Sequence, residues 1–519
     1  MAVEGKVFMR RRPFACLPLL LALLLAAAGI GAAQDVITVY PTGIAATDVA
    51  NVQAAVNAVA SPGTVILKST DLSGTPLAFN FGGTTPATGG VIPILRPDIT
   101  LTGDGWDEAL DEPKTKIVGG GGPFSFTPTV RGGNLVFAIR APGVTIREIK
   151  LTTSVAYTAV FIVSTTEWPA GDHAVVIERN HLDALNYAVL GQFTAAFPVV
   201  IDRNLLHSEY TVVGGLWTGL TLTSPGDEIA VPLDASGNPV RHRFEVTRNR
   251  IVTASCALWV YGWSNRYSVD PDPDVACRRL GSAGSYTYQY APGGNGPVLI
   301  AENEIAIDSE VEMMDLGGPG AGLADAVFWK NVVSGNALWG VWVSPWSHGN
   351  LIMDNDFSAL HALRPIEMSG PGIVYNNVFG PQPPGTTDPV VALVSAHYQE
   401  TTTPAPHPVE GAVIAKNDYR ATGATSGAIL LATATELGWG GPPIELRDNL
   451  VFEGGGFLPG TGGAAEHVTV VAGLINPATG LPYVHDNRIV GESASGLTDP
   501  GIGPMLARLN QLRKMLERR

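Results

Sequence analysis

The sequence predicts an all-β protein, specifically a right-handed parallel β-helix, and three observations support this fold class. The phrase VVIERNHL at residues 175–182 recurs as VVIDRNLL at residues 199–206, and eight further copies of it follow. The 61 glycines and 39 prolines indicate many turns and few long helices. The segments between copies, such as CALWVYGW at 256–263, have the composition of strands. A repeat period of this kind indicates a solenoid.

Each copy alternates apolar and polar residues and is rich in valine and isoleucine, which predicts a short strand with one buried face. Asparagine stands at the same offset in every copy, where it readily takes the left-handed conformation and its amide can bond amides stacked above and below. We therefore expect a ladder of asparagines at one corner of the coils, at positions 180, 204, 249, 303, 331, 355, 377, 417, 449 and 487.

Leucine-rich repeats also place asparagine after apolar alternation, so they are the competing solenoid. They require leucine-rich strands and a helical return segment. The strands here are rich in β-branched residues, and ALWGVWVSPW at 337–346 is again strand-like. Composition therefore favours the β-helix, which we expect to occupy residues 131–497, after an N-terminal cap and first coils over 34–130.

Two segments predict helices at the ends of the solenoid. In residues 48–67, Asp48 is a candidate N-cap, valines follow at helical spacing, and Pro62-Gly63 ends the helix before a strand. Such a helix would cover the exposed edges of the first coil. Residues 498–519 include a second amphipathic stretch with Met505, Leu509 and Leu512 on one face. It is expected to cap the other end, to pack along the barrel, or to join subunits into an oligomer.

The first 33 residues have the layout of a secretory signal. Four basic residues precede an apolar run from Leu17 to Ile30, and small residues lead to a cleavage point near Ala33. An uncleaved membrane anchor over 14–33 is the alternative. In both readings the body of the chain is exported, so we expect it to be secreted or held at the cell surface, with no membrane contact after cleavage.

Export places Cys256 and Cys277 in an oxidising compartment, where we expect them to form a disulfide; two separate buried thiols are the alternative. The whole chain has a net charge of −15, and residues 1–33 carry +3, so the mature chain carries −18. That charge excludes nucleic acid as a partner. The segment 503–519 is basic, with a net charge of +4.

With these features, the chain resembles the pectin-lyase-like superfamily of right-handed β-helices. The likeness rests on the predicted helix followed by GTVIL at 63–67, on RPDITLTGDG at 96–105 and on TKIVGGG at 115–121. The resemblance implies a polysaccharide ligand. The catalytic motifs of polygalacturonases and pectin esterases are absent, since only Ser347-His348-Gly349 approaches the first of them. The loose aspartate and arginine pattern of pectate lyases is not excluded.

Acidic residues supply the candidate catalytic groups. Asp308, Glu310 and Glu312 alternate and would share one strand face, where repulsion raises their pKa values or requires a cation. Arg364 could neutralise a uronate or accept a proton, as in lyases of the superfamily, or pair with Glu367. Alignment on the asparagine also places Asp183 beside His207, and Glu209 in one row with Asp308, a second candidate acid–base set. A solvated polar face is the alternative for both.

Aromatic and histidine side chains gather in the middle of the chain, where flat rings could stack on sugars, although core packing would account for part of the set. The substrate-binding candidates are Trp259, Trp263, Trp339, Trp342, Trp346, His348 and His361. Asp270, Asp272 and Asp274 alternate with proline and are candidate calcium ligands, but the loop lacks the glycine and glutamate of an EF-hand. Calcium is thus the one cofactor considered, and none is required.

These observations predict an exported β-helix whose middle coils bind an extended, polyuronate-like polysaccharide. Two classes of function stay open. The protein could be an enzyme, namely a lyase, an epimerase or a glycoside hydrolase, or it could be a non-catalytic surface or adhesion module that uses the same groove.

Overall fold

The computed structural model describes the chain between residues 34 and 489, with gaps. The described ranges are 34–83, 88–125, 131–164, 173–193, 198–209, 211–216, 243–261, 265–268, 287–289, 298–308, 314–316, 326–343, 350–368, 372–380, 391–393, 412–419, 429–431, 445–447, 450–451, 457–458, 480, 484–485 and 488–489. The predicted signal segment and the C-terminal segment 498–519 lie outside them.

Parallel strands form nearly the whole described structure. The first sheet has 14 strands, in the order β1-β2-β5-β11-β14-β17-β20-β25-β28-β30-β32-β35-β38-β41. Their bounds are Val36–Val39, Gly63–Leu67, Ile99–Thr102, Thr145–Arg147, Val175–Glu178, Pro198–Asp202, Arg243–Thr247, Val298–Ala301, Ala326–Trp329, Asn350–Met353, Gly372–Tyr375, Val413–Ala415, Glu445–Arg447 and Val484–His485.

The second sheet contains two series of strands, which the long strands β29 (Val332–Val343) and β31 (Asp356–Met368) join. The corner series, which follows the asparagine positions, is β3 (Phe79–Asn80), β8 (Thr115–Val118), β12 (Ile149–Thr152), β15 (His181–Ala184), β18 (Leu205–Ser208), β21 (Arg250–Thr253), β26 (Glu304–Asp308), β33 (Val378–Phe379), β36 (Asp418–Tyr419), β39 (Leu450–Val451) and β42 (Arg488–Ile489). The outer series is β4 (Ile92–Ile94), β10 (Arg131–Ile139), β13 (Thr158–Ser164), β16 (Tyr187–Phe193), β19 (Thr211–Leu216), β22 (Cys256–Tyr261), β27 (Met314–Leu316), β34 (Val391–Leu393), β37 (Ile429–Leu431) and β40 (Phe457–Leu458).

Antiparallel pairs are confined to excursions from this pattern. They are β6 (Trp106–Asp107) with β7 (Glu112–Pro113), β23 (Asn265–Ser268) with β24 (Thr287–Gln289), and β9 (Gly122–Ser125) with β10.

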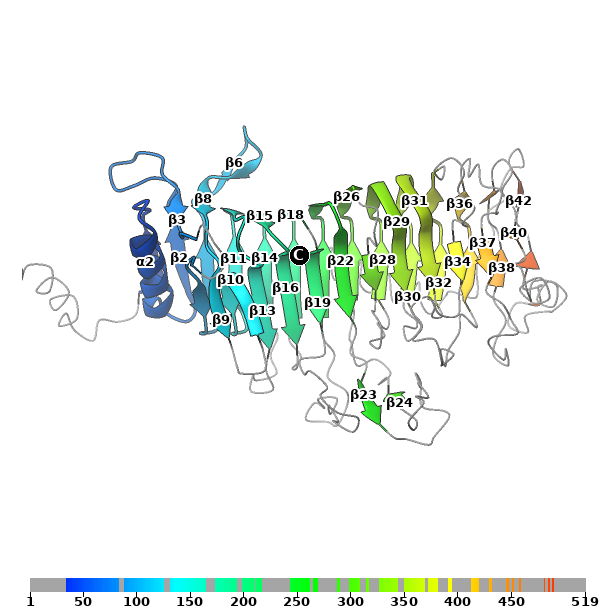
Figure 1. Ribbon diagram of the computed structural model, residues 1–519, viewed down its shortest axis with the longest axis horizontal. Helices are drawn as coiled ribbons and strands as arrows, with labels where there is room; N and C mark the ends of the chain where they lie inside the picture. Colours follow the sequence, from blue (N-terminus) through cyan, green and yellow to red (C-terminus); the bar gives the residue numbers. More distant parts are fainter. Residues whose placement is uncertain are drawn as a thin grey trace, which may run out of the picture.

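The chain passes in turn through the first sheet, the corner series and the outer series, and then enters the next strand of the first sheet. After β14, β15 and β16 it enters β17, which pairs in parallel with β14. Figure 1 shows the resulting elongated stack, with successive strands side by side along its long axis. The arrangement is consistent with a parallel β-helix and confirms the all-β, parallel class that the repeats predict. The described return segments are strands, so the leucine-rich alternative, with its helical returns, does not fit.

The predicted asparagine ladder is present over the eight positions that the structure describes. Asn180 Oδ1 accepts a hydrogen bond from Ile149 N. From Asn204 onward, each Oδ1 accepts hydrogen bonds from the backbone N–H and the side-chain amide of the preceding ladder asparagine. Asn204 Oδ1, for example, lies 2.9 Å from Asn180 N and 3.1 Å from Asn180 Nδ2. The same contacts continue to Asn417. All eight are buried. Asn449 and Asn487 lie outside the described residues.

The left-handed conformation belongs to the residue before each asparagine, and the prediction that asparagine itself adopts it is wrong. Arg203 has a φ of 53° and Glu302 a φ of 58°, and the same holds for Arg179, Arg248, Lys330, Asp354, Asn376 and Lys416. This turn directs the following asparagine inward, where its amide is needed for the ladder. The strained backbone is therefore placed on an exposed or half-buried residue whose identity matters less.

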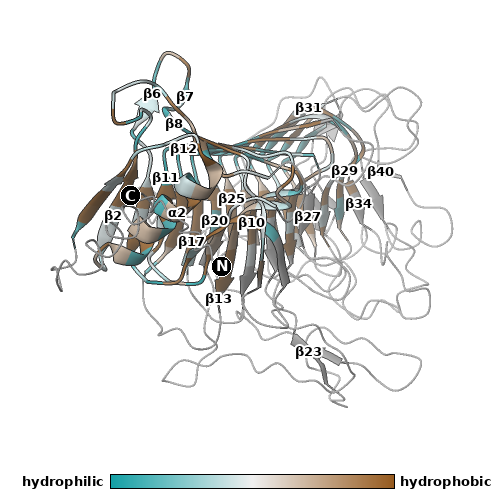
Figure 2. Ribbon diagram, turned by 60° about the vertical axis from the view of Figure 1, so that its left-hand side comes forward, coloured by the Kyte–Doolittle hydropathy of each residue, from teal (hydrophilic) through white to brown (hydrophobic). Residues whose placement is uncertain are grey.

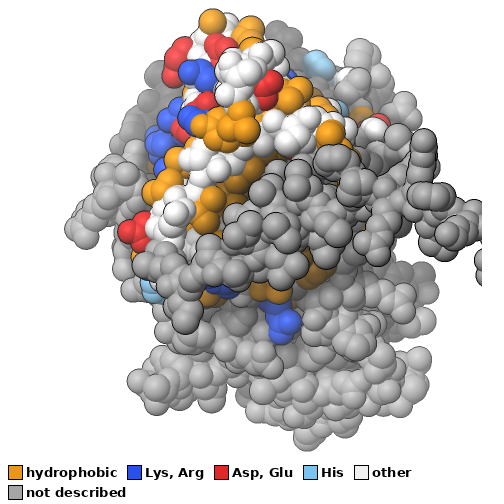
Figure 3. Space-filling model, turned by 90° about the vertical axis from the view of Figure 1, so that its left-hand side faces the viewer, with side chains coloured by type: hydrophobic (Ala, Val, Ile, Leu, Met, Phe, Trp, Pro, Cys, Tyr) orange, Lys and Arg blue, Asp and Glu red, His pale blue; other side chains and the backbone are white. Residues whose placement is uncertain are grey.

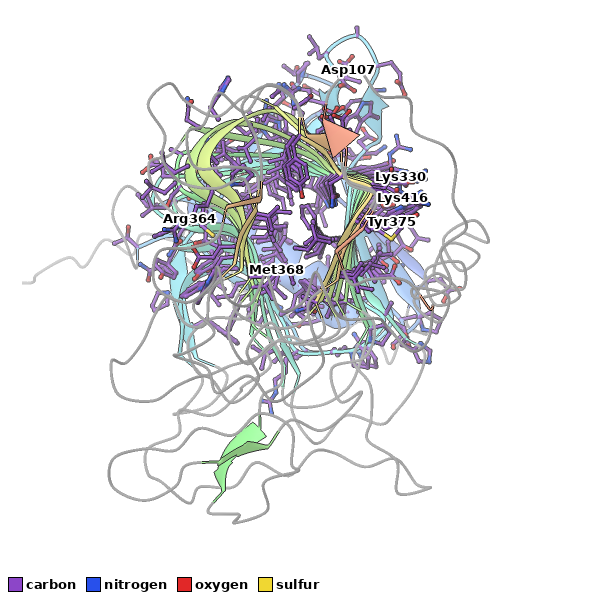
Figure 4. The ribbon with its side chains drawn as sticks, turned by 90° about the vertical axis from the view of Figure 1, so that its right-hand side faces the viewer. Asp107, Lys330, Arg364, Met368, Tyr375 and Lys416 are labelled. Atoms are coloured by element: carbon purple, nitrogen blue, oxygen red, sulfur yellow. The ribbon has the colours of Figure 1, made fainter. Side chains whose placement is uncertain are left out.

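Side chains between the sheets stack in the same register as the backbone. Phe357 and Phe379 lie with ring centroids 5.3 Å apart and planes at 3°, and Tyr419 continues the stack at 5.1 Å from Phe379. Burial raises the pKa of the Tyr419 hydroxyl. Figure 2 shows the hydrophobic residues concentrated on the strands. Figure 4 looks along the stack and places Arg364 and Met368 on one wall and Lys330, Tyr375 and Lys416 on the opposite wall.

Several strands of the first sheet are buried on both faces. The outward side chains of β25, β28 and β30 form a second apolar cluster that includes Leu299, Val327 and Leu351, each at most 4% exposed. The polar outer face expected from strict alternation is thus absent over these coils. Parallel strands that are covered on both faces have this nearly continuous apolar composition.

One helix, α2 (Ala45–Ala58), lies at the end of the stack where β1 and β2 begin (Figure 1). Its N-cap residue is Ile44, so the prediction that Asp48 is the N-cap is wrong. Asp48 is instead buried in the first turn, where its carboxylate accepts hydrogen bonds from Thr42 N, Gly43 N and Asn80 N at 2.7, 3.1 and 2.8 Å. Among the described residues, no helix is long and apolar enough to cross a membrane.

Candidate functional site

The outer series of strands brings two predicted substrate-binding residues, Trp259 and Trp342, into one lateral row. Trp259 on β22 is in register with Asp315 on β27, Asp315 with Trp342 on β29, and Trp342 with Glu367 on β31. The neighbours Leu258 and Val341 belong to the core. Because side chains alternate along a strand, Trp259, Trp342 and Glu367 lie on the outer face of the sheet.

The side chains of this row, and Trp339 beside it, differ in how much of their surface is exposed. Trp342 is 2% exposed, as packing predicts, whereas Trp259 and Trp339 are half-buried and keep part of their surface accessible. The two half-buried tryptophans are therefore the described rings that a sugar could reach. His361 is exposed on β31, and Asp308, Asn336 and His361 occupy one register row.

Arg364 and Glu367 form the ion pair that was one of the two predicted roles of Arg364. Arg364 Nη1 lies 2.6 Å from Glu367 Oε2, and the Glu367 side chain is 0% exposed. Arg364 is in register with Trp339 on the adjacent strand. A buried carboxylate depends on such a partner, since removing one member of a buried pair costs about 3–5 kcal/mol. The pair also places a guanidinium, 24% exposed, beside the tryptophans.

Other predicted site residues fall outside the described residues. They are Glu310, Glu312, Trp263, Trp346, His348, Asp270, Asp272, Asp274 and Cys277. The calcium loop and the Cys256–Cys277 disulfide accordingly stay predictions. Cys256 Sγ lies 3.2 Å from the carbonyl oxygen of Leu258. Within the described ranges, no group of three or more histidine, cysteine or acidic side chains could hold a metal ion.

A second group of functional side chains lies on the outer face of the corner series, near the start of the stack. We refer to Glu112, Lys116, Lys150, His181, Asp183 and His207 as the histidine–lysine cluster. The predicted neighbours Asp183 and His207 are in register on β15 and β18, and Asp183 Oδ1 lies 2.9 Å from His207 Nδ1. Both side chains are partly exposed, at 33% and 42%.

Lys150 connects this pair to an acidic residue from an excursion. It is in register with His181 on β15, and its ammonium contacts Glu112 Oε2. The other oxygen of Glu112 lies 3.0 Å from Lys116 Nζ. The hydrogen bond from Lys150 holds the pKa of Glu112 below its usual value.

The surroundings of His181 shift the pKa of its imidazole. Its burial lowers the pKa of the imidazole below 6.5, and the neighbouring Lys150 lowers it further. Its Nδ1 atom is buried and has no hydrogen-bond partner among the described residues. The imidazoles of His181 and His207, the Lys150 ammonium and the Asp183 carboxylate are groups that general acid–base catalysis uses.

The sequence indicated only part of this cluster. Asp183 and His207 follow ladder asparagines at equal offsets, so alignment of the copies paired them. Lys150 belongs to a coil in which Ile149 replaces the asparagine, and no repeat phrase marks it. Glu112 lies on the β6–β7 excursion, whose return to the sheet depends on the fold. His181 directly follows Asn180, and this position next to a ladder asparagine is the sequence feature that could have identified it as part of the cluster.

No protein-family model, no curated protein and no solved structure matches this chain.

Proposed function

We propose that the protein is an exported right-handed parallel β-helix of the pectin-lyase-like type, closed at its first coil by α2, that binds an extended polysaccharide along the outer series of strands. The observation that supports this most directly is that the half-buried Trp259 and Trp339 lie on the outer series, with the partly exposed Arg364 in register with Trp339. Adjacent parallel strands repeat every 4.7–4.9 Å or so, which is comparable to the length of one sugar residue.

The chemistry of the row favours an acidic glycan. Half-buried Trp259 and Trp339 supply apolar ring faces, and the Arg364 guanidinium supplies a partly exposed cation that can bind a carboxylate bidentately. The ion pair with Glu367 fixes the direction of the Arg364 guanidinium.

The test is binding of the secreted protein to polygalacturonate, alginate and a neutral glucan, measured by affinity electrophoresis. Trp259→Ala and Trp339→Ala should each weaken binding of a polyuronate by about 1 kcal/mol, roughly the value of one ring contact. Trp106→Ala, a tryptophan on the distant β6, is the matched control. Equal binding by all four proteins would refute the site, and absence of binding to every polymer would refute the function.

Acid–base catalysis on a glycan is a second candidate function, and the histidine–lysine cluster is the observation that favours it. Polyuronate digests would be followed by ultraviolet absorbance of unsaturated products, for a lyase, and by reducing ends, for a hydrolase. An enzyme that uses the cluster should lose turnover in His181→Ala and His207→Ala, while Asp308→Asn tests the middle coils. Binding without turnover would favour the surface or adhesion module.

A further inference from the structure

A groove runs along β1, the first strand of the first sheet, away from the proposed glycan site. It encloses about 760 Å³, within the range of roughly 300–1,000 Å³ that is typical of ligand pockets. Three segments line it: residues 37–42, the α2 face formed by Asn51, Ala54, Ala55 and Ala58, and the loop residues Asp71, Leu72, Ser73 and Leu77. Figure 3 looks at this end of the molecule and shows hydrophobic side chains across the described surface.

One wall of the groove is a strand edge whose backbone groups have no partner among the described residues. β1 pairs with β2, and the bonds from Thr64 N to Asp35 O and from Lys68 N to Val39 O show which residues face β2. Backbone groups alternate between the two edges of a strand, so Val36, Thr38 and Tyr40 direct theirs to the other edge. No described residue bonds to them there.

The opposite walls are apolar and firmly held. Positions 51, 54, 55 and 58 share one helical face, and the three alanines on it allow close approach of another backbone. Leu72 is 85% exposed. It is carried by a tight loop in which Asp71 Oδ1 accepts hydrogen bonds from Ser73 N at 2.8 Å and Thr75 N at 3.0 Å. The leucine is thus held rigidly in an exposed position, which an occupant of the groove would cover.

We propose that this groove binds an extended segment of another polypeptide, which adds as a strand to the free edge of β1. N–H and C=O groups at every second residue, without a partner among the described residues, are complementary to an extended backbone. The alanine face, Leu72 and Leu77 would contact small or apolar side chains of that segment. An exported protein that gains a strand in this way would be anchored to a partner by its first coil.

The residues that precede β1 in this chain and a second copy of the protein are the two other candidate occupants. Among the described residues, Gln34 O accepts a hydrogen bond from Ala60 N and Asp35 O accepts one from Thr64 N, so these two residues bond away from the outer edge of β1. A second copy of the protein would bring its own α2, which packs on its own β1, into the space beside the groove. A single extended strand brings no such element.

The experiment selects peptides from a phage-displayed random library on the purified secreted protein and measures the best sequence by fluorescence anisotropy. Thr38→Pro removes an N–H at the free edge, a change that edge strands tolerate. Ala58→Glu fills the groove from the exposed side of α2. Ala50→Glu places the same charge on an exposed helix position outside the groove and is the matched control.

We expect the selected peptide to bind the wild type and Ala50→Glu equally, and to bind Thr38→Pro and Ala58→Glu at least about tenfold more weakly. A peptide with N-methyl groups on alternate residues should also fail to bind. Circular dichroism melting curves check that the variants are folded. Failure to enrich any sequence on the wild type over Ala58→Glu would overturn the proposal. A concentration-dependent dimer that Thr38→Pro disperses would overturn it in favour of a second copy.

Discussion

At the scale of single residues, the asparagine ladder is the interaction on which most others depend. Asn303 accepts hydrogen bonds from Asn249 N and Nδ2 at 2.9 and 3.0 Å and donates to Val246 O and Asn331 Oδ1, both at 2.9 Å. One amide therefore satisfies groups on both neighbouring coils. A backbone N–H left unsatisfied in this buried corner would cost about 1–3 kcal/mol.

Asn303→Ala should accordingly lower the free energy of unfolding by about 3 kcal/mol or more, because it leaves several buried groups without partners. Asn57→Ala, on the exposed side of α2, should change stability by less than about 0.5 kcal/mol. Urea unfolding followed by circular dichroism measures both. Similar stability of the two variants would show that the ladder amide contributes little.

His181 predicts a pH dependence of stability. Its pKa in the folded protein lies below the ordinary 6.5, with burial as the main cause and Lys150 as the second; Asp183 and Glu112 act in the opposite direction, and His207 lowers it slightly. The unfolded chain then binds a proton more readily than the folded one. The contribution to stability is therefore present above pH 6.5 and is lost as the pH falls through the folded pKa.

His181→Asn should flatten the dependence of the melting temperature on pH between about pH 5 and 7. The titration of the His181 ring, followed by NMR, should have its midpoint below 6.5 in the wild type. A midpoint above that value would contradict the assignment, as would an unchanged pH profile in the variant.

At the scale of elements, the position of α2 depends on the Asp48 carboxylate, which the sequence wrongly indicated as the N-cap of the helix. Asp48 is fully buried and binds the backbone N–H groups of Thr42, Gly43 and Asn80, so it ties the chain before the helix to β3. The sequence predicted a helix here from the spacing of its valines. It could not show that Asn80, 32 residues away, would lie beside the aspartate.

Asp48→Ala should loosen this end of the molecule selectively. We expect faster hydrogen exchange in α2, β1 and β3 with little change in β14 or β17, because contacts in a solenoid are mainly between neighbouring coils. Asp71→Ala, in the neighbouring loop, is the control, since its carboxylate bonds only within that loop among the described residues. Uniform protection across the protein would contradict a local role for Asp48.

At the scale of the whole molecule, the coils are interchangeable units. Ladder positions Asn180 and Asn204 are 24 residues apart, and the strands between them form one full turn. Deletion of residues 181–204 would join Asn180 to Leu205 and let β14 pair with β20 in the register that β17 now uses. The neighbouring coils would meet through equivalent side chains.

This deletion should leave a folded, less stable protein with the same β-rich circular dichroism spectrum. Deletion of residues 181–192, half a turn, should yield insoluble protein, because it brings strands of different sheets into one row. Expression of both variants and thermal melting of the soluble one test the idea. A soluble half-turn variant with native-like melting would contradict it.

The sequence by itself determined the repeating part of this protein. Each of the ten repeats carries its own β-branched strand and its own asparagine, so the interactions that stack these coils are encoded locally and repeat with the chain. Tertiary structure decided which residues meet across coils of unequal length. It set which residue adopts the left-handed turn, that Lys150 contacts Glu112, and that Trp342 is buried while Trp259 is partly accessible. It also set that no described residue pairs with the outer edge of β1 beside α2. These contacts depend on where each excursion returns to the sheets, and the spacing of residues along the chain does not specify that return.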